Sequence, residues 1–224
     1  MSYCLLCESH YRPTINFKEL FLFKKIHEPV ICSTCFKKFK KISNKYCKIC
    51  HKKMDKDDIC QDCKKWQESY KDKVLINQAC YEYNRAFHDL MVNYKRYGDY
   101  VLRKVLAELV YDKVPQADYY VPIPTSLDHR KKRKYDTIYE IFNSLVPLTP
   151  LLTKLNTEEA QGEKSKKERM MANQSFEAIE GVKIEGQVVL LDDIYTTGRT
   201  LYHARDALIK KYPNLEIKSF TIAR

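Results

Sequence analysis

The residues best suited to chemistry in this 224-residue chain are eight cysteines in its first third. They form four Cys-x-x-Cys pairs: Cys4 and Cys7, Cys32 and Cys35, Cys47 and Cys50, and Cys60 and Cys63. Each pair can turn two thiolates toward one point, and two pairs complete the tetrahedral set that Zn²⁺ prefers. The spacing therefore predicts two structural zinc sites, which fold the chain rather than catalyse.

The pairing of these cysteines has two solutions. In the sequential solution the first two pairs bind one ion and the last two bind the other. In the cross-braced solution the first pair joins the third and the second joins the fourth. Redox dithiols and an iron–sulfur cluster are the weaker alternatives, because redox pairs rarely come four at a time. The ninth cysteine, Cys80, lies in a strand-like stretch and is interpreted as a small buried residue.

A second group of reactive side chains lies at residues 188–200. Four apolar residues, 188–191, predict a buried strand, and Asp192 and Asp193 follow at its carboxyl end. Carboxylates there can accept hydrogen bonds from ribose hydroxyls and hold Mg²⁺ through water. Backbone N–H groups at the start of the next helix attract phosphate, threonine hydroxyls add donors, and Gly198 permits close approach. The candidate site comprises Asp192, Asp193, Ile194, Tyr195, Thr196, Thr197, Gly198, Arg199 and Thr200.

Two other interpretations of this stretch are open. The bland one is a strand that ends in an acidic turn and a helix cap. A Walker-B strand is the other, but no Walker-A loop accompanies it. The chain has only five glycines, and the one pair with P-loop spacing, Gly181 and Gly186, is followed by Gln187 and Val188.

The elements that must position these residues alternate between strand and helix after about residue 72. Hydrophobic periodicity predicts strands at 74–83, 119–123, 147–152, 188–191 and 215–223, and helices at 86–97, 101–110, 126–144 and 198–211. This order is typical of an α/β fold with a mainly parallel sheet flanked by helices. We therefore expect a cysteine-rich double zinc-ribbon domain at 1–66 and an α/β domain at 67–224. Residues 153–175 are polar and poorly periodic.

Positive charge is concentrated in short clusters within a chain of net charge +11. Such clusters neutralise nucleic-acid phosphates, and neighbouring aromatic rings can stack on exposed bases. A solvated surface is the alternative for any one cluster. One cluster, Lys37, Lys38, Lys40 and Lys41, lies between the cysteine pairs. The candidate nucleic-acid-binding residues are Arg130, Lys131, Lys132, Arg133, Lys134, Lys164, Lys166, Lys167 and Arg169.

No apolar run reaches the roughly 18–20 residues that a membrane-spanning helix needs. The first residues, 1–4, also lack a basic region that leads into an apolar stretch. These features predict a cytoplasmic protein without a membrane span. Disulfides are uncommon in the cytoplasm.

Taken together, the motifs resemble two known patterns. Residues 192–200 are similar to the phosphoribosyl pyrophosphate (PRPP) motif of type I phosphoribosyltransferases. A double zinc ribbon followed by such a domain resembles the ComF/ComFC family of competence proteins over essentially the whole chain. The stretches 94–99 and 121–124 also match, as do Gln161, Arg169, Asn173 and Phe176.

The resemblance implies a type I phosphoribosyltransferase-like fold, with PRPP and Mg²⁺ as ligands besides zinc. Asp192 and Asp193 would bind the ribose hydroxyls, and residues 195–200 would surround the 5′-phosphate. It also implies a role in natural transformation and DNA uptake. The partners would be single-stranded DNA, a DNA translocase or helicase of the same operon, and other DNA-processing competence proteins.

Three functions stay open at this point. The favoured one is an accessory protein that handles incoming single-stranded DNA and binds PRPP. The second is an active Mg²⁺-dependent phosphoribosyltransferase, with its pyrophosphate loop at 124–130 and the 153–175 stretch as a lid. The third is a structural adaptor for a DNA translocase.

The chain departs from the family pattern at residues 133–137. There the family usually has Arg-Gly-Phe-Asn-Gln, whereas this chain has Arg-Lys-Tyr-Asp-Thr. Only the arginine and an aromatic residue are retained. The role of the two lost amides is therefore in question.

Overall fold

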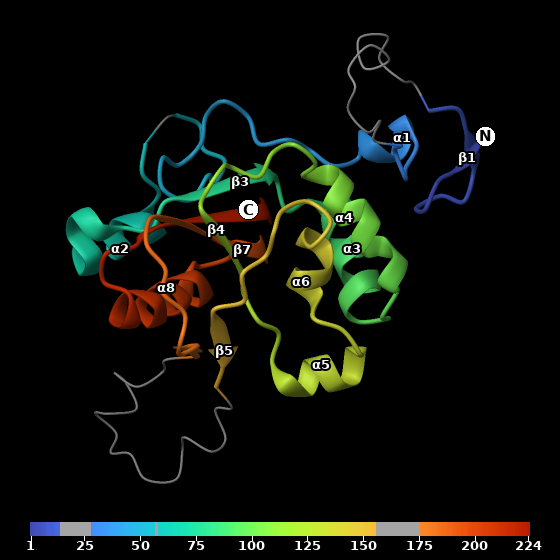
Figure 1. Cartoon of the computed structure of the whole chain (residues 1–224). Helices are drawn as coiled ribbons and strands as arrows, with labels where there is room; N and C mark the ends of the chain where they lie inside the picture. The colour runs from blue at the N-terminus through green and yellow to red at the C-terminus, as the bar shows by residue number, and fades with distance from the viewer. Residues whose placement is uncertain (14–27, 57, 156–174) are drawn as a thin grey trace, which may run out of the picture.

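The computed structural model describes residues 1–13, 28–56, 58–155 and 175–224 (Figure 1). Its centre is a four-stranded parallel sheet with the order β3-β8-β7-β4. Two antiparallel two-stranded sheets, β5-β6 and β1-β2, complete the strands of the described part. The strands are β1 (Ser2–Tyr3), β2 (His10–Tyr11), β3 (Asn77–Tyr81), β4 (Tyr119–Pro122), β5 (Leu152–Lys154), β6 (Phe176–Ala178), β7 (Gln187–Ile194) and β8 (Glu216–Ala223). The parallel α/β arrangement predicted from the sequence is confirmed.

The helices of the described part are α1 (Ser33–Phe36), α2 (Gln61–Tyr70), α3 (Arg85–Lys95), α4 (Arg103–Leu109), α5 (Leu127–Arg133), α6 (Thr137–Phe142) and α8 (Arg199–Lys211), with short 3-10 turns at Lys71–Lys73 and Tyr100–Leu102. Residues of α3, α4 and α6 pack on one face of the sheet, and residues of α8 pack on the other. None of the helices in the described part of the chain is long and apolar enough to cross a bilayer.

Alternation along β7 divides the core into two clusters. Val189 and Leu191 point into the first cluster, together with residues of α3, α4 and α6. Val188 and Leu190 point into the second, which contains residues of α8, β5 and β6. β7 is thus buried on both faces, as its run of apolar residues predicts.

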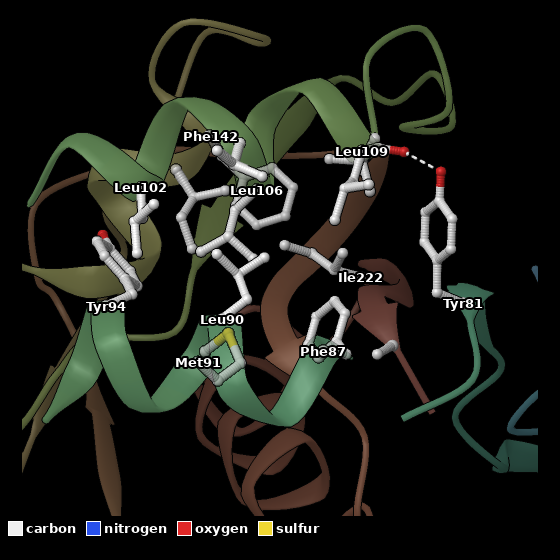
Figure 2. Packing of buried hydrophobic residues seen from close by; sticks show 14 of the residues in the cluster. Tyr81, Phe87, Leu90, Met91, Tyr94, Leu102, Leu106, Leu109, Phe142 and Ile222 are labelled. Atoms are coloured by element: carbon white, nitrogen blue, oxygen red, sulfur yellow. Dashed lines mark hydrogen bonds between the residues drawn. The ribbon is translucent and has the colours of Figure 1, made fainter. Parts of the chain in front are cut away.

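Figure 2 shows the packing of the first cluster. Leu90 and Met91 of α3 face Leu102 and Leu106 of the opposing helix segment, and Phe142 closes the space between them. Tyr81 is fully buried, and its hydroxyl donates to the Leu109 carbonyl over 2.8 Å. This bond satisfies a polar atom that would otherwise weaken the core.

Two predicted elements are wrong in detail. The single helix expected at 126–144 is two helices, because Lys134 adopts a left-handed conformation (φ 71°) and Asp136 then caps α6. The strand expected at 147–152 begins only at Leu152. Pro147 and Pro150 lack the N–H donors that a ladder needs, and only Leu148 makes an isolated bridge, to Tyr120.

The cysteine-rich segment shares its cores with the α/β part. Cys4 and Cys35 belong to the first cluster, while Cys47 and Cys63 belong to the second. The domain boundary expected between residues 66 and 67 falls inside α2 (Gln61–Tyr70) and stays a prediction.

Candidate functional site

The two aspartates lie where the sequence predicts them, at the carboxyl end of β7. Asp192 pairs in register with Thr221 of β8, and the strand ends two residues later. Asp193 is buried and Asp192 is half-buried. The backbone N–H of Asp193 donates to the Asp192 carboxylate over 2.9 Å, which fixes that side chain at the edge of the sheet.

Lys95, the last residue of α3, is the cation that faces these carboxylates. Its ammonium group forms an ion pair with Asp193. Its own carbonyl accepts a 2.8 Å hydrogen bond from Arg133 Nε, which ties the end of α3 to α5. Sequence reasoning did not assign Lys95 to the site. The available signal was its position in the stretch 94–99 that matches the family.

Burial and neighbouring charges both shift the pKa values of Asp192 and Lys95. Burial and, to a smaller extent, the neighbouring Asp193 carboxylate raise the pKa of Asp192, Lys95 opposes both effects, and the net pKa is about 7. Burial by itself would lower the pKa of Lys95, but the two carboxylates outweigh it and raise the pKa above its ordinary value. Lys95 is therefore a fixed positive charge, and Asp192 titrates near neutral pH.

The loop after β7 folds over the ring of Tyr195. Tyr195 is buried, and its hydroxyl has no hydrogen-bond partner in the described part of the chain. Gly198 has φ +86° and lies over this ring, so that a Cβ there would come within 2.2 Å of the tyrosine oxygen. Only glycine combines that backbone angle with this approach. Helix α8 begins at the next residue, Arg199.

Three backbone N–H groups of this loop are available to a ligand. Within the described residues, those of Thr196, Thr197 and Gly198 have no hydrogen-bond partner. Consecutive N–H groups of this kind, at the start of a 13-residue helix, attract an anion. The loop thus offers donors next to a pair of carboxylates, as the sequence predicts.

Two residues that hold this loop were missed by the sequence reasoning. Arg224, which follows β8, donates to the carbonyls of Tyr195 and Thr196 over 3.1 and 2.6 Å. Trp66 of α2 donates its indole N–H to the carbonyl of Thr197 over 2.9 Å. Neither residue belongs to a motif, and tertiary folding alone brings them to the loop.

The structure brings the eight cysteines together in the sequential pairing. The sulfur atoms of Cys4, Cys7, Cys32 and Cys35 lie within 4.8 Å of one another, and so do those of Cys47, Cys50, Cys60 and Cys63. Each set has the donor chemistry and the compactness of a four-thiolate metal site. Hydrogen bonds from Cys50 and Cys63 lower the pKa of Cys47, which favours the thiolate form that a metal binds. Cys80 lies apart, on β3, and burial raises its pKa to about 11.

A cavity of about 770 Å³ opens at the end of β4, where Pro122 pairs with Leu191, the residue before Asp192; neither Asp192 nor Asp193 lines it. Pro122 and Pro124 at the end of β4 and Lys154 at the end of β5 line it. Lys154 is close enough to Asp192 to lower its pKa. The remaining lining comes mainly from the segment 125–140 and from Tyr100.

The acidic side chains that line this cavity have bonding partners, whereas two of its cations form no ion pair within the described residues. Its two acids are engaged, since Glu140 accepts from Tyr100 over 2.5 Å and Asp136 caps α6 and accepts from the Thr125 N–H. Arg130 and Lys134 also line the cavity, and neither forms an ion pair within the described residues. The ionisable side chains that line the cavity therefore carry a net positive charge.

The basic residues predicted from sequence divide in two. Residues 130–134 lie on α5 and at its end, and Arg133 is engaged with the end of α3. The second cluster, Lys164, Lys166, Lys167 and Arg169, lies outside the described residues, as do Gln161 and Asn173.

The departure at 133–137 has a structural consequence. Asp136 occupies the cap of α6, and Tyr135 donates its hydroxyl to the Tyr94 carbonyl over 2.5 Å. Thr137 Oγ1 lies 2.9 Å from the Thr125 hydroxyl. The substituted residues thus serve internal bonds that hold α6 against the segment after β4.

The fold and these residues define an α/β protein with a parallel sheet and two four-cysteine groups. A scan against models of known protein families finds no match. The chain is 30% identical over 225 residues to the competence protein ComFC of Streptococcus pneumoniae (strain ATCC BAA-255 / R6), covering 99% of both chains. It is 29% identical over 229 residues to ComFC of Bacillus subtilis (strain 168), covering 99% of this chain and 94% of that one. The chain belongs to the ComFC family of competence proteins.

Among solved structures, the chain is similar to that of the allosteric regulatory enzyme of purine biosynthesis. The TM-score is 0.30 and the identity 21%, over 52% of this chain and 25% of the other. A likeness this slight says nothing about the site.

Proposed function

We propose that this chain is a competence accessory protein that binds PRPP with Mg²⁺ and handles single-stranded DNA during natural transformation. One observation carries the first half: the free N–H groups of residues 196–198 lie directly after Asp192 and Asp193, at the carboxyl end of β7. Ligands of parallel α/β sheets bind beyond the carboxyl ends of the strands. Membership of the ComFC family supports the second half.

Each residue of the proposed PRPP site has a defined task. The N–H groups of 196–198 and the nearby hydroxyls would hold the 5′-phosphate, and Asp192 and Asp193 would accept hydrogen bonds from the ribose hydroxyls. Lys95 holds the Asp193 carboxylate in place through an ion pair. Bound Mg²⁺ would neutralise pyrophosphate charge.

Single-stranded DNA is the ligand that the cavity beside this site favours. Arg130, Lys134 and Lys154 supply cations for backbone phosphates. Tyr100 and Tyr139 line the same cavity and are partly exposed, so a base can stack on either ring. The two cysteine groups would each bind one structural Zn²⁺.

Phosphoribosyl transfer is the second candidate, and the position of the cavity favours it. An acceptor nucleotide bound between Lys154 and Arg130 would lie next to the ribose site. Transfer would then release pyrophosphate from PRPP. Release above the rate without protein, measured over a panel of bases, nucleosides and nucleotides, distinguishes this candidate from binding alone.

Calorimetry on the zinc-loaded chain tests the main proposal. We expect PRPP to bind with Mg²⁺ present, and Asp192→Asn combined with Asp193→Asn to abolish binding. Fluorescence anisotropy should show single-stranded DNA binding that weakens steeply with salt and is lost when Arg130, Lys134 and Lys154 are changed to alanine. No PRPP binding by the intact chain would refute the site, and no DNA binding at low salt would refute the partner.

A further inference from the structure

The second cysteine group, Cys47, Cys50, Cys60 and Cys63, lies against the loop that we assign to the 5′-phosphate. Arg224 connects them directly. Its Nε donates to Cys50 Sγ over 3.4 Å, and its Nη1 donates to the carbonyls of Tyr195 and Thr196. The same guanidinium lies over the Tyr195 ring, 4.9 Å from its centre. One side chain therefore contacts a metal ligand and the loop at the same time.

Trp66 makes the second connection. Helix α2 begins directly after Cys60 and carries Cys63 in its first turn, so the metal ligands fix the start of the helix. Trp66 follows Cys63 by three residues and donates to the carbonyl of Thr197. Its indole stacks on Tyr202 of α8 with ring centres 4.0 Å apart and planes 15° apart. Its position therefore depends on both helices.

These contacts orient the N–H groups on which the phosphate site depends. A trans peptide is planar, so its carbonyl and its N–H point in opposite directions. Arg224 and Trp66 bind the carbonyls of residues 195, 196 and 197. The N–H groups of the same three peptides, which belong to residues 196, 197 and 198, consequently point away from these two side chains.

We propose that the second cysteine group, through Arg224 and Trp66, is a metal-dependent clamp that presets these three N–H groups for a phosphate. A bound metal would make Cys50 a thiolate, which strengthens the bond from Arg224. Metal occupancy of this group and binding of a phosphorylated ligand are then coupled, and the coupling is reciprocal. The clamp rests on the proposed PRPP site but makes predictions of its own.

Two conservative variants test the clamp by calorimetry with Mg²⁺ and PRPP. Trp66→Phe keeps an aromatic ring against Tyr202 and removes the N–H donor, so we expect about a fivefold loss of affinity, the worth of one hydrogen bond. Arg224→Lys keeps the charge and loses the forked geometry, and we expect a loss of about 10- to 100-fold. Arg85→Lys, at an exposed arginine of α3 that pairs with Asp89, is the matched control and should leave affinity unchanged. Full affinity in both clamp variants, with second-group zinc retained, would overturn the clamp.

Zinc release gives a readout that does not depend on activity. A chromophoric zinc chelator should remove zinc from the second group more slowly when Mg²⁺ and PRPP are present, and at an unchanged rate from the first group. The Cys7→Ser variant isolates the second group for this measurement. Equal release rates with and without the ligand would contradict the coupling.

Tryptophan emission separates failure of the clamp from failure of the PRPP site. Trp66 is the one tryptophan of the chain, so its emission reports on the contact with Thr197. Arg224 contacts the carbonyls of Tyr195 and Thr196, a different part of the loop from the carbonyl that Trp66 binds. We expect Arg224→Lys to shift the tryptophan emission to longer wavelength without any ligand. No binding of PRPP with a shifted emission would refute the site and leave the clamp supported. Binding of PRPP with an unshifted emission would refute the clamp and retain the site.

Discussion

The two cysteine groups share one local geometry and differ in what surrounds them. In each group a helix begins directly after the third cysteine, at Ser33 or at Gln61, and the N–H of that cysteine donates over 3.3 Å to the first sulfur of its group. The first helix has four residues and ends, whereas the second has ten and reaches α8. The same metal-binding pattern therefore supports two different roles.

Burial follows the same division. All four sulfur-bearing residues of the second group are buried, whereas Cys7 of the first group is exposed. The first group lies beside α4 through a bond from the Val30 N–H to Glu108, and Figure 1 shows α1 on the side of the molecule away from α2 and α8. We infer that the first group stabilises an edge of the protein, while the second group stabilises the proposed phosphate loop.

Removal of a metal ligand should separate the two groups most strongly. Structural zinc contributes about 10–16 kcal/mol in small zinc peptides, which is comparable to the whole stability of a typical protein, about 5–15 kcal/mol. We expect Cys63→Ser to unfold the face of the sheet under α8, and Cys7→Ser to leave the sheet intact. Zinc content and melting by circular dichroism measure both. Equal damage from the two variants would contradict the division of roles.

Gly198→Ala should weaken the binding of PRPP to the loop without unfolding the sheet. The new Cβ would lie 2.2 Å from the Tyr195 oxygen, so the loop must shift. A misplacement of about 1 Å in a positioned site can cost on the order of 100-fold, which is the loss of PRPP affinity that we expect. Gly181→Ala is the control, because Gly181 also has positive φ (+82°) but has nothing within 4 Å of a Cβ. Equal affinity in the two variants would show that the loop is not rigid.

The sequence predicted the parts of this site that lie close together along the chain. The four cysteine pairs and the stretch from β7 into α8 are local patterns, and both occur where expected. Trp66 and Thr197 are 131 positions apart, and Arg224 and Cys50 are 174 apart. Nothing in the local pattern of either residue distinguishes it from an ordinary surface tryptophan or arginine. Contacts of this kind arise from packing and cannot be derived from spacing.

The broken helix at 126–144 teaches the same lesson at shorter range. Its apolar spacing fits one continuous helix, but Lys134 takes a left-handed angle that any periodicity argument overlooks. The bonds of Asp136 to Thr125 and of Tyr135 to Tyr94 outweigh the local preference. Tertiary bonds that cannot be seen in the pattern determined where this helix ends.

The pH dependence of binding should arise from Asp192 and not from either cysteine group. Burial raises the pKa of Asp192 to about 7, so below that pH the free protein holds a proton that a bound ribose or Mg²⁺ must displace. We expect affinity for PRPP to fall as the pH decreases from 8 to 6, by up to about tenfold per unit below the pKa. The folded chain binds this proton more tightly than the unfolded chain does, so stability without ligand should change in the opposite direction and rise over the same range.

Calorimetry and thermal melting from pH 8 to pH 6 measure the two effects. Asp192→Asn should lower the affinity at pH 8 and flatten both profiles, while Cys7→Ser should retain them. An unchanged slope in Asp192→Asn would assign the titration to another group.

The smallest effect should come from the contact that anchors the first group. Glu108 accepts a 2.5 Å hydrogen bond from the Val30 N–H, and burial raises its pKa although this bond and one from the Ile31 N–H oppose the rise. Glu108→Gln keeps an acceptor oxygen and removes a charge that is costly to bury. We therefore expect a loss of no more than about 1 kcal/mol, or a shift in Tm of about 2–4 °C. Affinity for PRPP should not change, because the anchor lies on the other core cluster from the loop. A changed affinity in Glu108→Gln would connect the first group to the loop, and the two groups would then share one function.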